Sequence, residues 1–494
     1  MENTKKSSLK RFFGQVNLRE GKEWKVLLKF ALPIIFSYVL QQIYTISDAA
    51  ICGQTLSADE VAGVNDVFPL TFIFLQFAFG CTAGFSVITS NRIGLNDTNG
   101  VKKSFATQIM LCFVITAVLT VLSIVCLDPM LAWINVTPEN EAVYRAAYDY
   151  CFVIFCGIIA QMFYNFICSV LRSIGDSVTP LIFLFLSTLL NVGLDLLFII
   201  VFKWGVLGAA YATVAAQALS TVACFIYAIA KYKELSLTKK DFALSAREIK
   251  THLSQGLPLG LQFSVLAIGI IVMQGELVKF DIMPSGLMVE GNPAQNGFGA
   301  ANKLNNFLMA PLNAFGAAFV SFNAQNYGAL KYDRIKRGMY QGLAVVGVMY
   351  LFLAGIGLLL TIGGAYQYLF LSADKINDLT VSFGNNYLYV DLSLYFVLGA
   401  LFVLRSGVQG IGKSFYTLLA GTAELVARIL VCLFLPPLFN GGAINSEAGT
   451  LSYIMLCLAD PLAWIAAVAV LFYPFVKYVV KKKYSFGIPM TKQN

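Results

Sequence analysis

The feature that most constrains this chain is a series of long apolar stretches that recurs from one end of the sequence to the other. Clear examples are 26–51, 106–127, 181–202 and 344–362. Each is long enough to cross the hydrocarbon core of a bilayer as a helix, which takes about 20 residues. A transmembrane β-strand would instead show about 10 residues of alternating polarity. The sequence therefore predicts an all-α membrane protein.

The composition agrees with a membrane location. Hydrophobic residues make up 58% of the 494 residues and charged residues 13%, whereas a soluble domain carries about 25% charged residues. The net charge of +8 does not indicate nucleic-acid binding, because the basic residues lie mostly in short segments between apolar stretches. Lysine and arginine at such positions mark the cytoplasmic side of a membrane protein.

The apolar pattern predicts twelve transmembrane helices in two lobes of six. The expected spans are 26–52, 61–90, 105–127, 143–170, 180–202, 206–231, 251–275, 297–325, 338–363, 386–409, 415–438 and 450–478. A basic segment near the middle of the chain separates the two sets. We therefore expect a basic arm (1–25), an N-lobe with helices 1–6 (26–231), a linker (232–250), a C-lobe with helices 7–12 (251–480) and a tail (481–494).

The chain is predicted to be a multi-pass protein of the plasma (inner) membrane, with both termini in the cytoplasm. Basic residues gather in the arm, in the linker and at Lys481, Lys482 and Lys483 in the tail, and the positive-inside rule places all three on one side. The first apolar stretch is too long for a signal-peptide core, so the arm is expected to be retained. The outer connection 275–297 is longer than its counterpart in the first half, and nothing in the sequence assigns it a role.

The two predicted lobes share local sequence features in the same order. Leu-Pro opens the first and seventh helices at 32–33 and 257–258, a glycine ends the second and eighth at Gly94 and Gly328, and similar glycine-containing turns follow the fourth and tenth at 173–177 and 410–414. Lobes of six spans each begin on the same side. They would therefore be related by a parallel pseudo-two-fold repeat, which places substrate between the lobes.

Two acids within the predicted spans are the main candidate site residues. A carboxylate at mid-membrane is costly unless it is paired, protonated or hydrated, and it indicates function by default. Asp48 lies in the first helix with Gln41 two turns earlier, and Asp195 lies in the fifth with Asn191 one turn earlier. Neighbouring carboxylates hinder each other's ionisation, so the pair could carry a proton or, when ionised, bind sodium. The alternative is that both acids only make hydrogen bonds within their lobe.

Other polar residues in the spans have simpler interpretations. Glu424 and Arg428 are spaced i,i+4, so a neutralising pair within one helix is favoured over a gate or substrate site. Asp460 precedes Pro461 and could satisfy the polar groups that a proline kink frees. The ten cysteines lie mostly inside apolar stretches without metal-ligand spacing, which favours packing over a structural metal or disulfides.

No catalytic machinery is visible in the sequence. There is no GxxxxGK[ST] phosphate-binding loop and only one histidine, His252. We therefore expect a transporter rather than an enzyme, without a cofactor and driven by an ion gradient.

Three segments resemble the region from the fourth to the sixth helix of the multidrug and toxic compound extrusion (MATE) family. They are LRSIGDSVTP at 171–180, LNVGLD at 190–195 and WGVLGAA at 204–210. Further similarity is present in ALP at 31–33 and in DPLAW at 460–464. The resemblance covers nearly the whole chain.

The resemblance implies a two-lobed antiporter that exports small organic compounds, often cationic, in exchange for H⁺ or Na⁺ by alternating access. The protein is expected to act as a monomer. The family's coupling positions fall on Asp48, Asn191 and Asp195, with Gln41 and Thr213 as neighbours. Asn165 is a further candidate for the cavity.

The C-lobe departs from the pattern of some family members. It is apolar near Leu266 and Leu398, where they carry acids, and Asp391 is expected closer to the outer end of the tenth helix. Coupling through the C-lobe is therefore not expected. A lipid-linked oligosaccharide flippase of the same superfamily is the nearest alternative. Such a protein needs several cations in its cavity, and Arg428 is the only cation expected among the mid-span charges.

Overall fold

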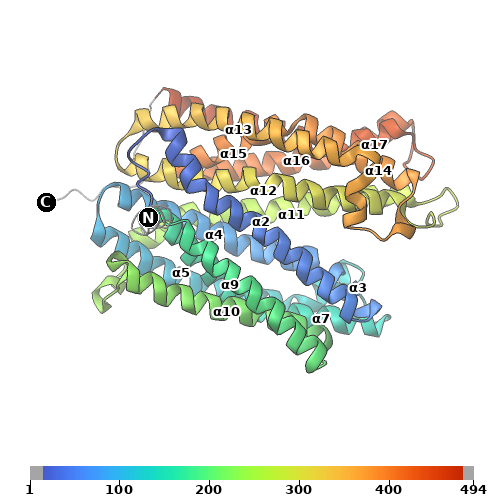
Figure 1. Ribbon diagram of the computed structural model, residues 1–494, viewed down its shortest axis with the longest axis horizontal. Coiled ribbons are helices and arrows are strands. Elements are labelled where there is room, and N and C mark those ends of the chain that lie inside the picture. The colour runs from blue at the N-terminus through green and yellow to red at the C-terminus, as the bar shows by residue number, and fades with distance from the viewer. Residues whose placement is uncertain (1–14, 482–494) are drawn as a thin grey trace, which may run out of the picture.

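The fold is an all-helical bundle whose helices run roughly along one axis (Figure 1). The computed structural model describes residues 15–481, so most of the predicted basic arm and nearly all of the tail lie outside the described residues. In the first half the helices are α2 (Glu23–Thr55), α3 (Ala58–Asp66), α4 (Phe68–Gly94), α5 (Thr98–Val125), α6 (Leu127–Trp133), α7 (Glu141–Cys156), α8 (Ile158–Ile174), α9 (Val178–Asp195) with the π-turn Leu196–Val201, and α10 (Gly205–Lys231).

The second half follows two short 3₁₀ turns in the linker. Its helices are α11 (Ala246–Val278), α12 (Pro293–Gly328), α13 (Tyr332–Thr361) with the 3₁₀ segment Ile362–Leu369, α14 (Asp378–Ser393), α15 (Tyr395–Gly410), α16 (Ser414–Asn440), α17 (Thr450–Cys457) and α18 (Ala459–Pro474) with the π-turn Phe475–Val480. In the described part of the chain, ten helical segments are long and apolar enough to span a membrane, and two bent helix pairs bring the number to as many as twelve.

Both bent pairs fall where single spans were expected. α7 and α8 meet at 45°, and α14 and α15 meet at 52°. The first break lies at Gly157, where an added Cβ would come within 2.3 Å of the Val214 side chain. The close approach of α10 therefore requires glycine at this corner. The second predicted span, 61–90, is likewise divided into α3 and α4, with the break at Val67 and Pro69 in the first turn of α4.

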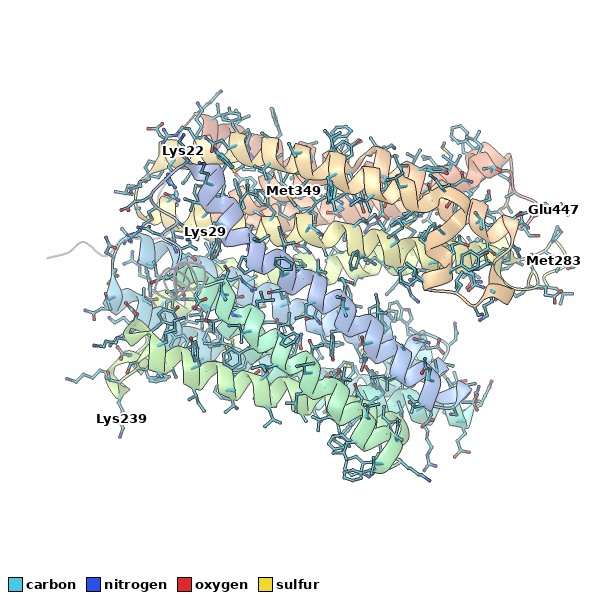
Figure 2. The ribbon with its side chains drawn as sticks, viewed as in Figure 1. Lys22, Lys29, Lys239, Met283, Met349 and Glu447 are labelled. Atoms are coloured by element: carbon cyan, nitrogen blue, oxygen red, sulfur yellow. The ribbon has the colours of Figure 1, made fainter. Side chains whose placement is uncertain are left out.

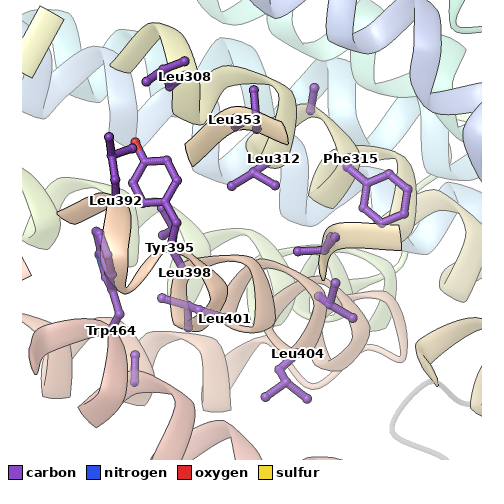
Figure 3. Packing of buried hydrophobic residues seen from close by; sticks show 14 of the residues in the cluster. Leu308, Leu312, Phe315, Leu353, Leu392, Tyr395, Leu398, Leu401, Leu404 and Trp464 are labelled. Atoms are coloured by element: carbon purple, nitrogen blue, oxygen red, sulfur yellow. The ribbon is translucent and has the colours of Figure 1, made fainter. Parts of the chain in front are cut away.

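The halves have separate hydrophobic cores, and the start of α2 belongs to the core of the second half. The core of the second half includes Phe315, Tyr395 and Trp464 (Figure 3) together with Phe30 near the start of α2. The core of the first half runs through α4, α5, α7 and α8. Farther along, α2 packs against α9 instead. One helix thus links the two packing units.

The ends of the bundle differ in charge and in spacing. Lys22, Lys29 and Lys239 lie toward one end, and Met283 and Glu447 lie toward the other (Figure 2). The first and last described residues are also at the lysine end, while the helices of the two halves diverge toward the opposite end (Figure 1). Helices such as α5 expose apolar side chains, among them Val118 and Val125, as a lipid-facing surface requires.

Candidate functional site

A cavity of about 290 Å³ lies between the two halves of the bundle. Residues from α2, α4 and α8 line one side, and residues from α11, α12, α14, α15, α16 and α18 line the other. The wall combines aromatic rings with side-chain amides, including Tyr38, Phe79, Phe263, Phe402, Trp464, Asn302, Asn306 and Asn313. Such a surface can hold an organic molecule that carries polar groups.

The second half contributes a charged network to this cavity. Arg405 on α15 binds Glu424 on α16, and Arg428 on α16 binds Asp460 on α18, each with an N–O distance of 2.5 Å. Arg428 and Glu424 are 3.8 Å apart and connect the two pairs. Each of the four side chains is at most 16% exposed. Two cations and two anions therefore neutralise each other inside the bundle.

This arrangement corrects the sequence interpretation of Glu424, Arg428 and Asp460. Glu424 and Arg428 each have a closer partner on a neighbouring helix, so they do not form an isolated intrahelical pair. Asp460 binds Arg428 rather than the backbone at a proline kink. The reason is helix packing: α16 contacts both α15 and α18, and a buried charge needs a partner with good hydrogen-bond geometry.

Arg405 and Arg172 are cavity residues that the sequence analysis missed. Both line the cavity together with Arg428, so it holds three arginines rather than one. The available signal was the position of Arg405 within a predicted span. Leu266 and Leu398 line the same cavity, so the two positions at which the sequence lacks acids contribute apolar side chains to its wall.

Behind this wall, Asp391 belongs to a hydrogen-bonded network in the second half. Asp391 on α14 is fully buried and accepts a 2.7 Å bond from Asn305 on α12. The same amide nitrogen donates to the Tyr387 hydroxyl at 3.0 Å, and the Tyr395 hydroxyl donates to Asn305. Asp391 is therefore held among polar groups deep in the second half.

In the first half, α2 and α9 bring Asp48 and Asp195 together. Their carboxyl groups lie within interaction distance of each other. Asp195 is fully buried. Both of its carboxyl oxygens, one oxygen of Asp48 and the amide oxygen of Asn191 lack hydrogen-bond partners among the described residues. Burying such groups without partners is costly, so the cluster suits a bound proton or a small cation.

Only some of the other predicted N-lobe residues lie at this acid cluster. Thr213 accepts a 3.5 Å bond from Asn191, and its hydroxyl is 3.5 Å from that of Tyr44, a neighbour that the sequence analysis did not name. Gln41 has an exposed side chain. Asn165 on α8 has a buried amide nitrogen without a partner among the described residues, and no contact joins it to the acids.

The acid cluster and the central cavity are separate. None of the predicted N-lobe residues lines the cavity, so Gln41, Thr213 and Asn165 lie outside its wall in this structure. The two sites are connected through α2, because Tyr38 lines the cavity and Asp48 lies farther along the same helix. No group of three or more His, Cys, Asp or Glu within the described residues is arranged to hold a metal ion.

The two halves are in close contact at the end of the bundle that carries Lys22. An added Cβ at Gly94 on α4 would lie 2.1 Å from the Gln325 carbonyl oxygen on α12, and one at Gly328 would lie 2.0 Å from the Asn91 carbonyl oxygen. The side-chain amide of Gln325 also donates a 2.7 Å bond to the Ser173 carbonyl. The glycines at the ends of α4 and α12 therefore allow the two halves to meet.

The segment 15–22 crosses the same junction and is bonded to both halves. On the first half, the Val16 amide donates to the Gly175 carbonyl at 2.9 Å, and Arg19 donates to Asn96 at 2.7 Å. On the second half, Asn326 and Arg334 donate to the Leu18 carbonyl. We name this segment the N-terminal strap, because it ties the two halves together at this end.

The motif 171–180 forms a turn organised by Asp176. Asp176 accepts bonds from the Thr179 hydroxyl at 2.6 Å, the Tyr232 hydroxyl at 2.5 Å and the Lys231 ammonium at 3.0 Å. Burial alone would raise the pKa of Asp176, but these hydrogen bonds outweigh it and hold the pKa below its ordinary value. The motif thus fixes the connection between α8 and α9.

The connection 275–297 has a structural role that the sequence did not reveal. Asp281 is fully buried and accepts bonds from the Ala294 and Gln295 amides, each at 2.9 Å. These amides belong to the first turn of α12, where the helix leaves donors unsatisfied. Asp281 therefore caps the N-terminus of α12.

A cavity enclosed between two helical halves of a membrane bundle is the arrangement of a secondary transporter rather than an enzyme. Comparison with known families gives the same answer. The family model MatE matches residues 33–197 and 286–434, one stretch in each half and together well over half of the chain. The chain belongs to the multidrug and toxic compound extrusion family.

Relatives and solved structures agree with this assignment. The "Probable multidrug resistance protein YoeA" of Bacillus subtilis is 26% identical over 400 residues, covering 79% of this chain and 81% of the relative. The "FAD transporter" of Shewanella oneidensis is 24% identical over 333 residues, covering 65% and 69%. The fold matches the "Outward-facing conformation of a multidrug resistance MATE family transporter of the MOP superfamily" with a TM-score of 0.80 at 18% identity, covering 95% and 99%.

Proposed function

We propose that this protein is a secondary active antiporter that exports small organic compounds in exchange for H⁺ or Na⁺ by alternating access. The observation that carries the proposal is the Asp48–Asp195 pair, in which both oxygens of the fully buried Asp195 and one oxygen of Asp48 lack partners in the described structure. Two ionised carboxylates without partners are costly inside a membrane, and binding a proton or a sodium ion lowers that cost. The family relatives named as multidrug resistance proteins support the export function.

Coupling between ion and substrate is proposed to pass through α2. This helix contacts α9 in the first half and α12 in the second half. It carries Asp48 at the acid cluster and Tyr38 at the cavity wall. A change in the charge of the acid cluster alters the cost of packing α2 against α9, and thereby shifts the balance between the conformations of the two halves.

The setting of this proposal is the plasma (inner) membrane, with both termini in the cytoplasm and the protein acting as a monomer. The lysines grouped at the end of the bundle that carries Lys22 support that orientation (Figure 2). In it, the halves meet on the cytoplasmic side and diverge on the outer side (Figure 1).

The test is gradient-driven efflux of an organic dye from proteoliposomes, with a proton or a sodium gradient imposed. Asp48→Asn and Asp195→Asn should each lower the driven rate by about tenfold or more, because the amide cannot exchange the ion. Asp59→Asn is the matched control, since Asp59 is an exposed acid at the start of α3. Equal driven efflux by the Asp48→Asn, Asp195→Asn double variant would refute the proposal.

The nearest alternative is a flippase for lipid-linked oligosaccharides. Its support is the presence of Arg172, Arg405 and Arg428 at the cavity wall, because guanidinium groups suit a pyrophosphate headgroup. Against it, two of these arginines are neutralised by carboxylates. One relative is named "FAD transporter", and FAD is an anionic molecule. Flipping of a pyrophosphate-linked lipid without gradient-driven efflux of any soluble compound would favour the flippase.

A further inference from the structure

We propose that Arg172 makes the central cavity a site for aromatic substrates that carry a carboxylate or phosphate group. This inference rests on the proposed export function and names its substrate class. It reverses the expectation of cationic substrates, which the family resemblance implied and which the charges of Asp48 and Asp195 do not restore. Those acids do not line the cavity, so their charge does not select the substrate.

The charges of the cavity wall differ between the two halves. On the second half, Arg405 with Glu424 and Arg428 with Asp460 form two short ion pairs. Each of these carboxylates already has a guanidinium partner, and each guanidinium has a carboxylate. This side of the cavity is therefore close to neutral and has little free charge to offer a substrate.

On the first half, Arg172 faces these pairs without a carboxylate of its own. Its guanidinium donates a 3.0 Å bond to the Ser169 hydroxyl, and no salt bridge to it occurs within residues 15–481. Asp391 is fully buried, bound by Asn305, and does not line the cavity. The charged groups of the wall thus leave one uncompensated cation, on α8.

Other residues of the cavity wall fit the proposed substrate. A guanidinium can bind a carboxylate or phosphate through two parallel N–H bonds. Aromatic rings, including Phe263, Phe402 and Trp464, line the cavity beyond it and can pack against a ring system. The amides of Asn302 and Asn313 add polar contacts. A cation can also contact these rings and the amide oxygens, so the repulsion by Arg172 is what disfavours it.

Arg172 also connects substrate binding to the contact between the halves. It directly precedes Ser173, whose carbonyl accepts the bond from Gln325 across the junction. Tyr38, on the helix that carries Asp48, lines the same cavity as Arg172. An anion bound to Arg172 therefore lies beside the junction, in a cavity that α2 also lines.

The experiment compares two xanthene dyes of similar shape and opposite charge, fluorescein and rhodamine 123, by fluorescence anisotropy with the purified full-length protein. Fluorescein should bind the parent about tenfold or more tighter than rhodamine 123. R172Q should weaken fluorescein binding by about tenfold, while R172K keeps the charge and stays within about threefold. R247Q is the control, because Arg247 is exposed near the start of α11.

The outcomes separate this inference from the export proposal. Equal or tighter binding of rhodamine 123 by the parent overturns the inference, and this result needs no variant to fold. Unchanged fluorescein binding by a folded R172Q overturns it as well. Fluorescein binding that depends on Arg172, without gradient-driven transport of either dye, supports the inference and counts against antiport. Driven efflux of rhodamine 123, without fluorescein binding, leaves antiport standing and refutes the inference.

Discussion

The side-chain amide of Gln325 on α12 donates a 2.7 Å hydrogen bond to the carbonyl oxygen of Ser173 at the end of α8. Gln325 is 2% exposed, so the bond is shielded from water, and it joins the two halves below the cavity. Alternating access requires the halves to separate at one end while they close at the other. This bond must therefore break each time the junction opens.

Gln325→Met should loosen the junction. The substitution keeps the size of the side chain but removes a bond worth about 1 kcal/mol, so hydrogen exchange at 171–176 and 325–331 should rise by about fivefold. Exchange at 378–393, at the far end of the bundle, serves as the internal control and should not change. Unaltered exchange at the junction would show that the bond does not hold the halves together.

Gly328→Ala should destabilise the closed junction more strongly. The new methyl group would lie 2.0 Å from the Asn91 carbonyl oxygen, which is backbone and cannot move aside. Overpacking of this kind costs about 1–3 kcal/mol, so thermal unfolding in detergent should occur several degrees lower. The matched control is Gly347→Ala on α13, where an added Cβ meets nothing within 4 Å. Similar melting temperatures for both variants would contradict the close approach.

Arg334→Gln should release the N-terminal strap. Arg334 donates to the carbonyls of Leu18, Glu20 and Gly21 and lies 3.6 Å from Glu23. Its side chain is 8% exposed, and removing such a buried charge partner costs about 3 kcal/mol. Limited proteolysis should then cut at Lys22 faster than in the parent.

The control for the strap is Arg337→Gln. Arg337 also binds Glu23, at 2.9 Å, but its side chain is 59% exposed, and exposed ion pairs contribute little. Cleavage at Lys22 should therefore stay close to the parent rate. Equal protection in the Arg334 and Arg337 variants would show that the strap does not depend on Arg334.

Asp176→Asn should lower stability at neutral pH and lose its effect in acid. The pKa of Asp176 is held below its ordinary value in the folded protein, so its carboxylate stabilises the fold above the unfolded pKa of about 3.9. That contribution is lost as pH falls through the folded pKa. Melting temperatures of parent and variant should therefore differ at pH 7 and converge below about pH 4. Asp59→Asn, at an exposed acid at the start of α3, is the control. A constant difference across this range would contradict the assignment.

Much of the fold could be predicted from the sequence, because the cost of exposing polar backbone in a membrane forces long apolar helices. The all-α membrane bundle is confirmed, and its twelve expected spans agree with the structure when each bent pair counts as one span. The breaks at Gly157 and Leu394 were not foreseen. They depend on how neighbouring helices approach each other, and an apolar pattern does not record that.

The candidate site was predictable only in part. Asp48, Asn191 and Asp195 stood out because unpaired acids are rare in membranes, and the structure places them together. Their coupling role stays a prediction. Arg172 and Arg405 were missed because they lie near span ends or among apolar residues, and nothing local to the sequence shows that they face a cavity.

The sequence by itself determined the membrane class, the helical spans and the position of the buried acids, because each follows from the free energy of placing one residue type in a bilayer. Only the tertiary structure decided that Glu424 pairs with Arg405, that Asp460 pairs with Arg428 and that Asp48 lies apart from the central cavity. A buried charge selects its partner by distance and geometry across helices. Those distances are set by the packing of segments far apart in the chain.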